Sequence, residues 1–435
     1  MKRLAIVAAA VLFTNAGLAP LDSLTLAQGR QGTQPQYDLL LKGGHVIDPR
    51  SDINRRMDVA ITAGKIARVA DTIPAGDARR VVDVSGLFVT PGLLDIHVHV
   101  YNGPDVLAEY SGDRSLPPDG FTFRSGVTTV VDLGSSGWRS FADFKTQMID
   151  RSRTRVLAML NIVGRGMAGG STIEQNTQDM DAEATAKVAR QYSDLIVGVK
   201  TAHFTGPEWT AVDRAVAAGT AANIPVAVDF GNFNPGRPFE ELVTKHLRPG
   251  DWYTHMYLQR VPFFDANGKL RPYLLEARKR GVKFDVGHGG GSFSWSNAIP
   301  AIQQGFVPDS ISTDLHTGSM NAGMKDMTNV MSKILNQNVR LADVIRMSTI
   351  NPATQIKRPE LGHLSVGAGA DVAVLRVDEG NFGFLDAQGA RADGTKRIVC
   401  ELTLLNGNVV WDLNGRAGQD WKTFYAAKPS SAPRR

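Results

Sequence analysis

The strongest constraint on the fold of this chain is a strand-then-helix unit that recurs about every thirty residues through its middle. Between the apolar segments lie stretches with helical periodicity, such as 182–193, 210–223 and 272–281, which end near a Gly or Asn. Eight such units predict an α/β protein built on a (β/α)8 TIM barrel. The apolar segments that begin them are 90–100, 126–136, 154–164, 193–202, 224–231, 250–257, 281–291 and 309–318.

The two ends of the chain differ from the middle. Residues 36–90 and 358–418 contain short apolar runs separated by Gly, Asp-Pro and Asn-Gly turns, which are typical of antiparallel strands. We predict that both ends together form one small β-sandwich domain. The barrel would then occupy 91–357, and a C-terminal tail would follow at 419–435.

The first residues have the pattern of an export signal. Lys2 and Arg3 precede the apolar run LAIVAAAVLF and then small residues. The pattern predicts a signal peptide over 1–27 and an exported protein, periplasmic or extracellular, with a short membrane anchor as the alternative. After cleavage we expect no membrane partner, because no other segment approaches the length of a spanning helix.

Composition excludes some classes of site and partner. Cys400 is the single cysteine, so the chain cannot form an intramolecular disulfide or a cysteine-based zinc site. The formal net charge is +5 and the basic residues are scattered along the chain, which argues against a nucleic-acid partner. We expect a small-molecule substrate. The sequence leaves the oligomeric state open, a homo-oligomer included.

Polar residues stand at the ends of several predicted strands, where barrel enzymes carry their chemistry. A buried imidazole or charge costs free energy unless it is paired or bound to metal. Imidazole and carboxylate ligands suit Zn²⁺, with Mn²⁺ or Fe²⁺ as alternatives, so we predict a metal centre. The polar residues concerned are His97, His99, Lys200, Asp229, His255, His288, Asp314 and His316.

Three of these residues need an interpretation of their own. His97 and His99 alternate with apolar residues, so on a strand both imidazoles point to one face, as metal ligands would. Lys200 is harder to place, since an ammonium is repelled by cations. It is either a buried lysine paired with a carboxylate or a carbamate, formed with CO2, that bridges two metal ions.

Several motifs resemble the amidohydrolase superfamily of metallohydrolases. They are PGLLDIHVHV, SGVTTVVDLG, GVK before residue 201, THMY, STDLH and STINPATQIKRPELGHLSVGAGADVAVL. The chain looks most like the dihydroorotase and D-aminoacylase branch, in particular its amidohydrolase/deacetylase metallohydrolases, with FDVGHGGGSF as the telling stretch. The resemblance covers nearly all of the chain after the predicted signal.

The resemblance implies a role for each ligand. His97, His99 and Asp314 would bind the more buried of two Zn²⁺ ions, carbamylated Lys200 would bridge to the second, and His255 would ligate that one. Asp314 would be the catalytic residue, which takes a proton from the metal-bridging water and passes it to the leaving group.

Asp229 departs from the family pattern, in which the fifth strand usually ends in a histidine. Three interpretations stay open. Asp229 itself ligates the second metal, or His203 supplies the missing imidazole, or only one metal binds.

Further residues are candidates for substrate contact. His288 and Gly289 lie in a glycine-rich stretch that lets backbone approach a ligand, and the alternative for His288 is a structural turn. His203 follows the fourth strand and Arg165 the third; the alternatives are a packed loop and a surface arginine. His316 would support Asp314. We interpret the three remaining candidates as structural: His45, His246 and His363.

We therefore predict a metal-dependent hydrolase that attacks an amide or ester carbonyl with a metal-bound hydroxide. The substrate would be an N-acyl amino acid, a cyclic amide or an acyl ester. A deaminase of the same superfamily and a non-catalytic scaffold protein are the alternatives. The scaffold is disfavoured because the metal-ligand residues that such proteins lose are present here.

Overall fold

A computed structural model describes residues 35–103, 115–167 and 172–427. The predicted signal peptide and the last eight residues of the predicted tail lie outside this part of the chain. The described residues belong to one compact unit, Pro35–Arg435. Within them, no helix has both the length and the apolar character needed to cross a membrane.

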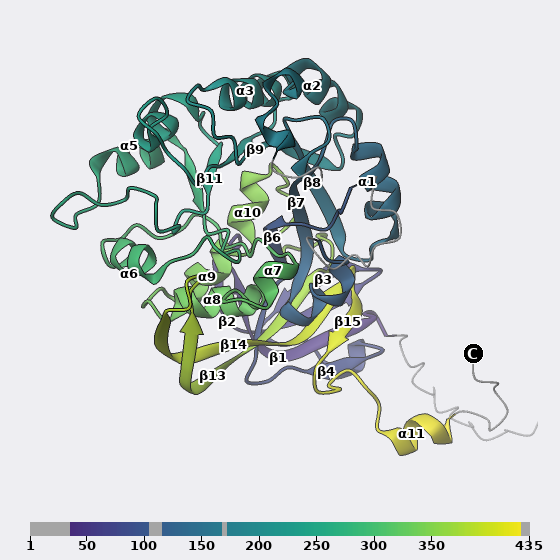
Figure 1. Cartoon of the computed structure of the whole chain (residues 1–435). Helices are drawn as coiled ribbons and strands as arrows, with labels where there is room; N and C mark the ends of the chain where they lie inside the picture. The colour runs from purple at the N-terminus through teal and green to yellow at the C-terminus, as the bar shows by residue number, and fades with distance from the viewer. Residues whose placement is uncertain (1–34, 104–114, 168–171, 428–435) are drawn as a thin grey trace, which may run out of the picture. The chain divides into compact units, whose positions relative to one another are not determined.

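A curled parallel sheet forms the centre of the chain (Figure 1). Its seven strands are hydrogen-bonded in the order β12-β11-β10-β9-β8-β7-β6, so each strand lies beside its neighbour in sequence. The strands are β6 (Leu93–Val98), β7 (Val127–Gly137), β8 (Arg155–Asn161), β9 (Ile196–Ala202), β10 (Val226–Asp229), β11 (Trp252–Thr254) and β12 (Lys283–Asp285).

The eighth predicted strand is present as two bridges rather than as a regular strand. Ser310 pairs in parallel with Asp285 of β12, and Leu315 pairs in parallel with Val98 of β6. The segment 310–315 therefore joins the two edges of the sheet, and the parallel ring closes as a barrel requires.

Helices follow the strands on the outside of the ring, as Figure 1 shows for α2 and α3. Local signals set their ends: Asp181 caps the first turn of α2, Asn223 ends α3 in a left-handed conformation, and Gly281 does the same for α5. The helices are α1 (Phe141–Gln147), α2 (Ala182–Gln191), α3 (Thr210–Ala222), α4 (Phe239–Glu241), α5 (Pro272–Arg280), α6 (Trp295–Gln303), α7 (Thr317–Met320), α8 (Met327–Leu335), α9 (Leu341–Met347), α10 (Ile350–Gln355) and α11 (Trp421–Ala426).

One apolar cluster draws side chains from six consecutive strands of the ring, as expected for a barrel interior. Ala353 of α10 and Ile356 just after it belong to the same cluster, so this helix covers one end of the interior. The cluster contains Leu94, Ile96, Val131, Leu133, Leu157, Met159, Val197, Ala227 and Trp252.

A second sheet combines both ends of the chain, as the sequence predicts. Its order is β15-β14-β13-β5-β1-β2-β3, with β4 paired to β1. It contacts the barrel directly, because Thr403 Oγ1 donates to the Phe123 carbonyl oxygen at 2.7 Å. Its strands are β1 (Leu39–Asp48), β2 (Ile53–Thr62), β3 (Lys65–Ala70), β4 (Val81–Asp83), β5 (Phe88–Pro91), β13 (Val372–Leu385), β14 (Arg391–Leu405) and β15 (Asn408–Asp412).

Candidate metal centre

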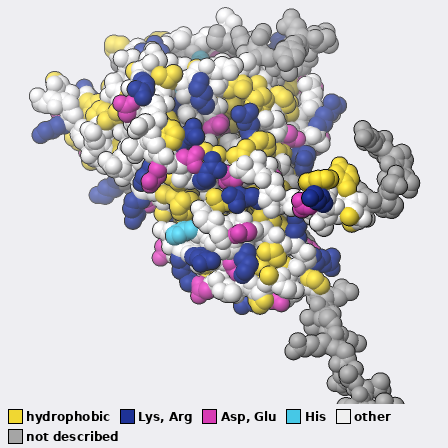
Figure 2. Space-filling view, turned by 90° about the horizontal axis from the view of Figure 1, so that it is seen from below, with side chains coloured by type: hydrophobic (Ala, Val, Ile, Leu, Met, Phe, Trp, Pro, Cys, Tyr) yellow, Lys and Arg dark blue, Asp and Glu magenta, His cyan; other side chains and the backbone are white. Residues whose placement is uncertain are grey.

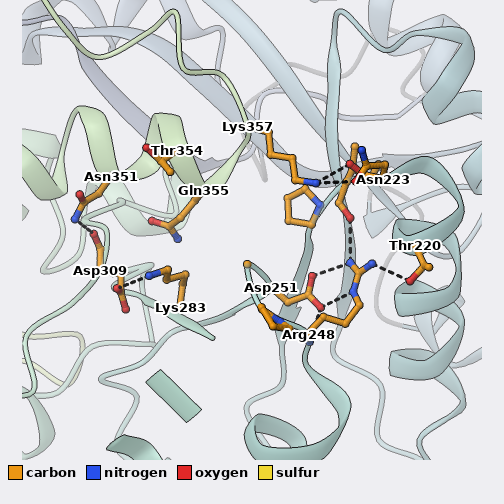
Figure 3. A pocket seen from close by; sticks show the side chains of 14 residues that line it. Thr220, Asn223, Arg248, Asp251, Lys283, Asp309, Asn351, Thr354, Gln355 and Lys357 are labelled. Atoms are coloured by element: carbon orange, nitrogen blue, oxygen red, sulfur yellow. Dashed lines mark hydrogen bonds and ion pairs between the residues drawn. The ribbon is translucent and has the colours of Figure 1, made fainter. Parts of the chain in front are cut away.

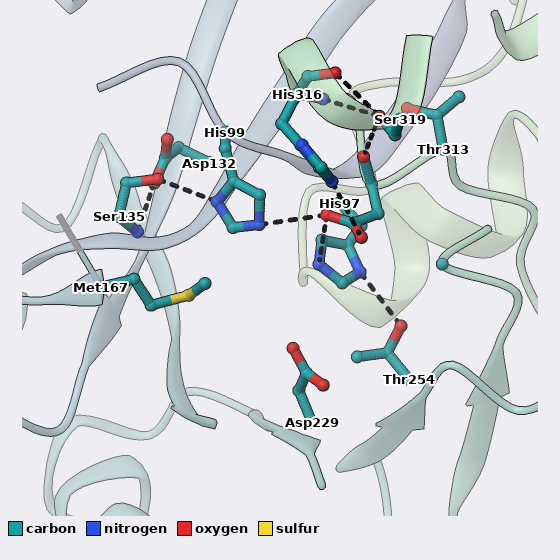
Figure 4. A network of polar contacts seen from close by, with 12 residues as sticks. His97, His99, Asp132, Ser135, Met167, Asp229, Thr254, Thr313, His316 and Ser319 are labelled. Atoms are coloured by element: carbon teal, nitrogen blue, oxygen red, sulfur yellow. Dashed lines mark hydrogen bonds and ion pairs between the residues drawn. The ribbon is translucent and has the colours of Figure 1, made fainter. Parts of the chain in front are cut away.

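The predicted ligands meet at the C-terminal ends of the barrel strands, where Figure 4 shows His97, His99 and Asp229. His97 and His99 lie at and just after the end of β6, each of the others lies on or directly after a different strand segment, and each is at least nine-tenths buried. The residues brought together are His97, His99, Lys200, Asp229, His255 and Asp314.

The first group of ligand atoms surrounds the Asp314 carboxylate. Asp314 Oδ1 lies 3.4 Å from His97 Nε2 and 3.2 Å from His99 Nε2. Two imidazoles and one carboxylate oxygen at this spacing can hold one divalent cation. This is the triad that the sequence predicts for the more buried metal.

The second group surrounds the Asp229 carboxylate. Asp229 Oδ1 lies 3.1 Å from His255 Nε2, and Asp229 Oδ2 lies 2.9 Å from Lys200 Nζ. Lys200 also contacts Met167 Sδ at 3.2 Å. Lys200 Nζ thus lies beside a carboxylate, and both the ion pair and the carbamate stay open for this residue.

His97 belongs to both possible metal-binding triads, with His99 and Asp314 on one side and with Asp229 and His255 on the other. Its Nδ1 is engaged by Thr254, so only Nε2 can bind metal, and one nitrogen serves one ion. His97 Nε2 is buried and has no hydrogen-bond partner. Because an orphaned buried nitrogen costs free energy, its place between the two carboxylates fits a metal ligand.

Hydroxyl and carbonyl groups fix the orientation of the three imidazoles. His97 Nδ1 lies 3.1 Å from Thr254 Oγ1, which in turn donates to Asp285 Oδ2 at 2.8 Å. His99 Nδ1 lies 2.9 Å from Ser135 Oγ, and His255 Nδ1 lies 2.5 Å from the Gly287 carbonyl oxygen. Each ring therefore turns Nε2 toward the site, as a metal ligand with a supporting partner does.

The charges of the site favour anionic carboxylates. Burial alone raises the pKa of Asp314, but the neighbouring His97 and His99 outweigh it and hold that pKa well below its ordinary value. Burial likewise opposes ionisation of Asp229, yet His255 and Lys200 hold its pKa well below the usual range. Burial lowers the pKa of His97, whose neutral form is the one that binds metal.

Backbone conformation also marks the site. His203, His255 and Asp314 all have positive φ, near +54°, +65° and +50°, which is uncommon outside glycine. Gly287 is required for close approach, since a Cβ there would lie 2.8 Å from His255 Nδ1 and 2.9 Å from His97 Nδ1. Such strained positions cluster at functional sites.

His203 lies at the edge of the second group. Its Nδ1 is 2.8 Å from Glu174 Oε2, and its Nε2 is 3.9 Å from Asp229 Oδ2. It is not a member of either triad of ligand atoms. Its place beside Asp229 agrees with a rim residue that faces substrate, and that role stays a prediction.

The expectation for the His288 side chain is wrong in this structure. The ring is fully buried, with Nε2 2.6 Å from Lys333 Nζ and Nδ1 2.9 Å from the Gly289 carbonyl oxygen. It stacks on Phe293 at 4.4 Å. Both ring nitrogens have partners away from the metal ligands, because the strand turns at Gly287, and the ring takes the structural place that was the alternative for His288.

Gly289, by contrast, lies against the site. A Cβ on this residue would meet Asp314 Oδ2 at 2.4 Å, so only glycine lets the backbone pass here. His316 turns Nε2 toward the same oxygen at 3.9 Å, in agreement with a supporting role. Arg165 is exposed in the turn after β8, and its carbonyl oxygen accepts a hydrogen bond from Ser140.

The remaining histidines lie elsewhere, as predicted. His45 contacts Asn54 on the neighbouring strand. His246 contacts Asp213 and stacks on Trp209 with ring centroids 3.9 Å apart, so Trp209 belongs to a packed surface. His363 lies after α10, toward the second sheet.

Sequence reasoning missed the residues that support the ligands. Thr254, Asp285 and Ser135 act through the histidines, and Glu174 acts on His203. Asp285 carried a signal, because a carboxylate inside the apolar segment 281–291 needs buried partners. It accepts hydrogen bonds from Ser310 and Ser312, both at 2.6 Å. No sequence signal pointed to Glu174, since this residue lies in a loop.

Another pocket, of about 430 Å³, opens at the opposite ends of the strands, beside the starts of β10, β11 and β12 (Figure 3). Most of the charged side chains that line this pocket pair with one another. The Arg248 guanidinium donates two hydrogen bonds to Asp251, and Lys283 approaches Asp309 at 3.5 Å. This is the face where barrel residues support stability, so we place the chemistry at the histidine cluster.

Comparison with known proteins relates the sequence to one enzyme family. A family model described as the amidohydrolase family matches residues 294–410. A deacetylase of Agrobacterium fabrum is 32% identical over 342 residues, which are 75% of this chain and 79% of that protein. A deacetylase of Enterococcus faecalis is 25% identical over 86% of this chain and 99% of its own.

Solved structures agree with the sequence comparison. A crystal structure of an adenine deaminase superposes with a TM-score of 0.77 at 26% identity, over 86% of this chain and 100% of that one. A dihydroorotase structure gives a TM-score of 0.73 at 29% identity, over 86% and 99% of the two chains. The fold is thus shared over nearly all of the described residues.

Proposed function

From the premise that this chain belongs to the amidohydrolase family, we propose that it removes an acyl group from the nitrogen of a small molecule. It is a metal-dependent amide hydrolase that acts on carbon–nitrogen bonds, as its deacetylase relatives support. The observation that carries the proposal is the buried triad of His97, His99 and Asp314, in which His97 Nε2 has no other partner.

His97 belongs to both possible triads, so we assign it to one metal ion only. His97, His99 and Asp314 would hold one Zn²⁺, and Asp229 with His255 would hold a second beside Lys200; Mn²⁺ or Fe²⁺ would fit the same nitrogen and oxygen atoms. When bound, a divalent cation supplies Lewis acidity to the scissile carbonyl and lowers the pKa of water.

The protein's own residues would handle the proton. Asp314 is a buried carboxylate beside His97 and His99, so we assign it as the group that accepts a proton from the attacking water. The same oxygen atoms can return that proton to the leaving nitrogen. Gly289 lets the backbone pass close to Asp314 Oδ2, where any side chain would clash with this oxygen.

The double variant His97→Ala with His99→Ala tests the proposal. Elemental analysis of the purified variant should find that bound metal is lost. Hydrolysis of the substrate should be lost as well. His246→Ala is a matched control, since that ring contacts Asp213 on the surface. Full metal content in the double variant would refute the assignment.

For Lys200 we propose the carbamate that bridges the two ions. Lys200→Ala should then be inactive, and short carboxylic acids should partly restore activity by supplying the missing oxygens. Full activity of Lys200→Ala without added acid would exclude a bridging role and favour the ion pair with Asp229.

The substrate class needs a screen. N-acyl-D- and N-acyl-L-amino acids, cyclic imides and acyl esters would test carbonyl hydrolysis. Adenine belongs in the same screen, because the similarity to an adenine deaminase structure favours deamination as a second candidate function. Release of ammonia without any acid product would indicate deamination.

Three further assignments belong to the proposal. The barrel would span 91–357, and the sheet from 36–90 and 358–418 would fold as a β-sandwich around its own apolar cluster, which includes Leu41, Val59 and Leu402. The protein would be exported after cleavage of 1–27, which fractionation of cells that express the full chain can test.

A further inference from the structure

A buried glutamate that none of these roles uses contacts the site through His203. Glu174 is 2% exposed and lies on a short turn, Ile173–Gln175, after β8. Its Oε2 lies 2.8 Å from His203 Nδ1, and its Oε1 accepts a hydrogen bond from Asn161 Nδ2 at 3.0 Å. A carboxylate buried this deeply needs a reason, because its desolvation is costly.

The contact decides which way the His203 ring faces. Since Nδ1 donates to Glu174, Nε2 is the nitrogen that remains, and it points to Asp229 Oδ2 at 3.9 Å. A buried acceptor that fixes the tautomer and plane of an imidazole is a known way to prepare that ring for contact with another group.

His203 is also the exposed member of its cluster. Three side chains surround the Asp229 carboxylate, and their exposed fractions are 0% for Lys200, 7% for His255 and 44% for His203. His203 therefore forms the solvent side of this part of the site.

The backbone holds His203 in place at some cost. Its φ of +54° is unfavourable for a residue with a side chain. Two hydrogen bonds maintain it: the His203 amide donates to the Asp229 carbonyl oxygen at 3.1 Å, and Gln175 Nε2 donates to the His203 carbonyl oxygen at 2.8 Å. Side chain and backbone are thus both constrained.

We propose that Glu174 is a positioning residue, which holds His203 so that Nε2 forms a hydrogen bond with the substrate on the Asp229 side of the site. The proposal rests on the proposed hydrolase function, because it needs a substrate in that position. It adds a contact that does not depend on His203 as a metal ligand.

A purely structural role for Glu174 makes different predictions. If Glu174 only holds Asn161 to the loop, its removal lowers stability, and its effect on kcat/KM is independent of His203. If Glu174 acts through His203, removing both side chains lowers kcat/KM no further than removing His203 alone, and metal content stays the same.

The experiment is a double-mutant cycle on zinc-loaded protein with the best substrate of the screen. Glu174→Ala and His203→Ala should each lower kcat/KM at least tenfold, and the double variant should fall no further than His203→Ala. Metal content and Tm should match wild type. Glu174→Gln keeps an oxygen acceptor and should recover part of the loss, whereas Gln178→Ala, an exposed side chain in the same loop, should have no effect.

Two results would overturn the proposal while leaving the hydrolase function standing: wild-type kcat/KM in Glu174→Ala, or losses that multiply in the double variant. If wild type turns over nothing in the screen, the proposed function fails instead. A crystal structure of zinc-loaded Glu174→Ala then decides the positioning role, which is refuted if the His203 ring keeps its orientation.

Discussion

At the scale of single residues, the most informative position is Asp229. A carboxylate here can form an ion pair with a lysine ammonium, whereas the histidine expected from the resemblance cannot. In the structure Asp229 contacts Lys200, His255 and, more distantly, His203. The chemical state of Lys200 therefore determines whether Asp229 compensates a positive charge or faces a negative one.

Asp229→Asn should separate these states in the metal-free protein. If Lys200 is an ammonium, the variant leaves a fully buried charge without its partner and should lose about 3–5 kcal/mol of unfolding free energy. Urea unfolding in the presence of a chelator measures the loss.

The control is Asp213→Asn, which removes the more exposed carboxylate beside His246 and should change stability by less than about 1 kcal/mol. An Asp229→Asn protein as stable as wild type would contradict the buried ion pair.

At the scale of elements, α8 fixes the loop that follows β12. Lys333 of α8 is fully buried, and its Nζ contacts His288 Nε2 and donates to the Gly323 carbonyl oxygen at 2.8 Å. His288 in turn contacts the carbonyl of Gly289, which lies against Asp314. The helix thus reaches the Asp314 carboxylate through one imidazole and one turn.

Burial lowers the pKa of Lys333 to about 7, while an unfolded lysine stays near about 10.4. Between these values the unfolded chain binds more protons than the native one, so this residue's contribution to unfolding free energy rises with pH, by at most about 1.4 kcal/mol per unit. It falls as pH drops toward 7 and is constant below. Lys333→Met should remove this slope.

Urea unfolding of wild type and Lys333→Met at pH 7, 8 and 9 tests the prediction. At each step up in pH, the unfolding free energy of wild type should rise relative to that of the variant. Lys187→Met, an exposed lysine on α2, should run parallel to wild type. A Lys333→Met curve that also runs parallel to wild type would show that the native lysine keeps an ordinary pKa.

At the scale of the whole molecule, the barrel brings together ligands that are far apart in sequence. His97 lies on the first strand of the ring and Asp314 on the segment that closes it, next to each other only because the ring closes. On the face seen in Figure 2, Lys and Arg side chains are interspersed with Asp and Glu. Function is therefore expected at the barrel mouth rather than on that charged face.

Removal of metal should lower the stability of the whole protein. A cation that binds only the folded chain stabilises it by about 4 kcal/mol at a thousand times its Kd, so Tm should fall by several degrees on chelation and recover with added Zn²⁺. Differential scanning calorimetry measures both changes. The double variant His97→Ala with His99→Ala should show the same low Tm with and without chelator.

The sequence by itself determined the barrel architecture and most of the polar residues that meet at the barrel mouth. Strand-then-helix units and glycine turns are local, so they predicted a parallel ring and a sheet built from both chain ends, and polar residues after apolar strands identified His97, His99, Lys200, His255 and Asp314. These signals work because the energetic cost of a buried polar group depends mainly on its own environment.

Only the tertiary structure decided where side chains point and with whom they pair. Spacing placed His288 at the mouth, yet the turn at Gly287 directs its ring to Lys333. No local pattern links Glu174 to His203, or Asp285 through Thr254 to His97, because these contacts join separate loops and strands. The direction of a side chain depends on backbone angles and neighbours that folding alone brings together.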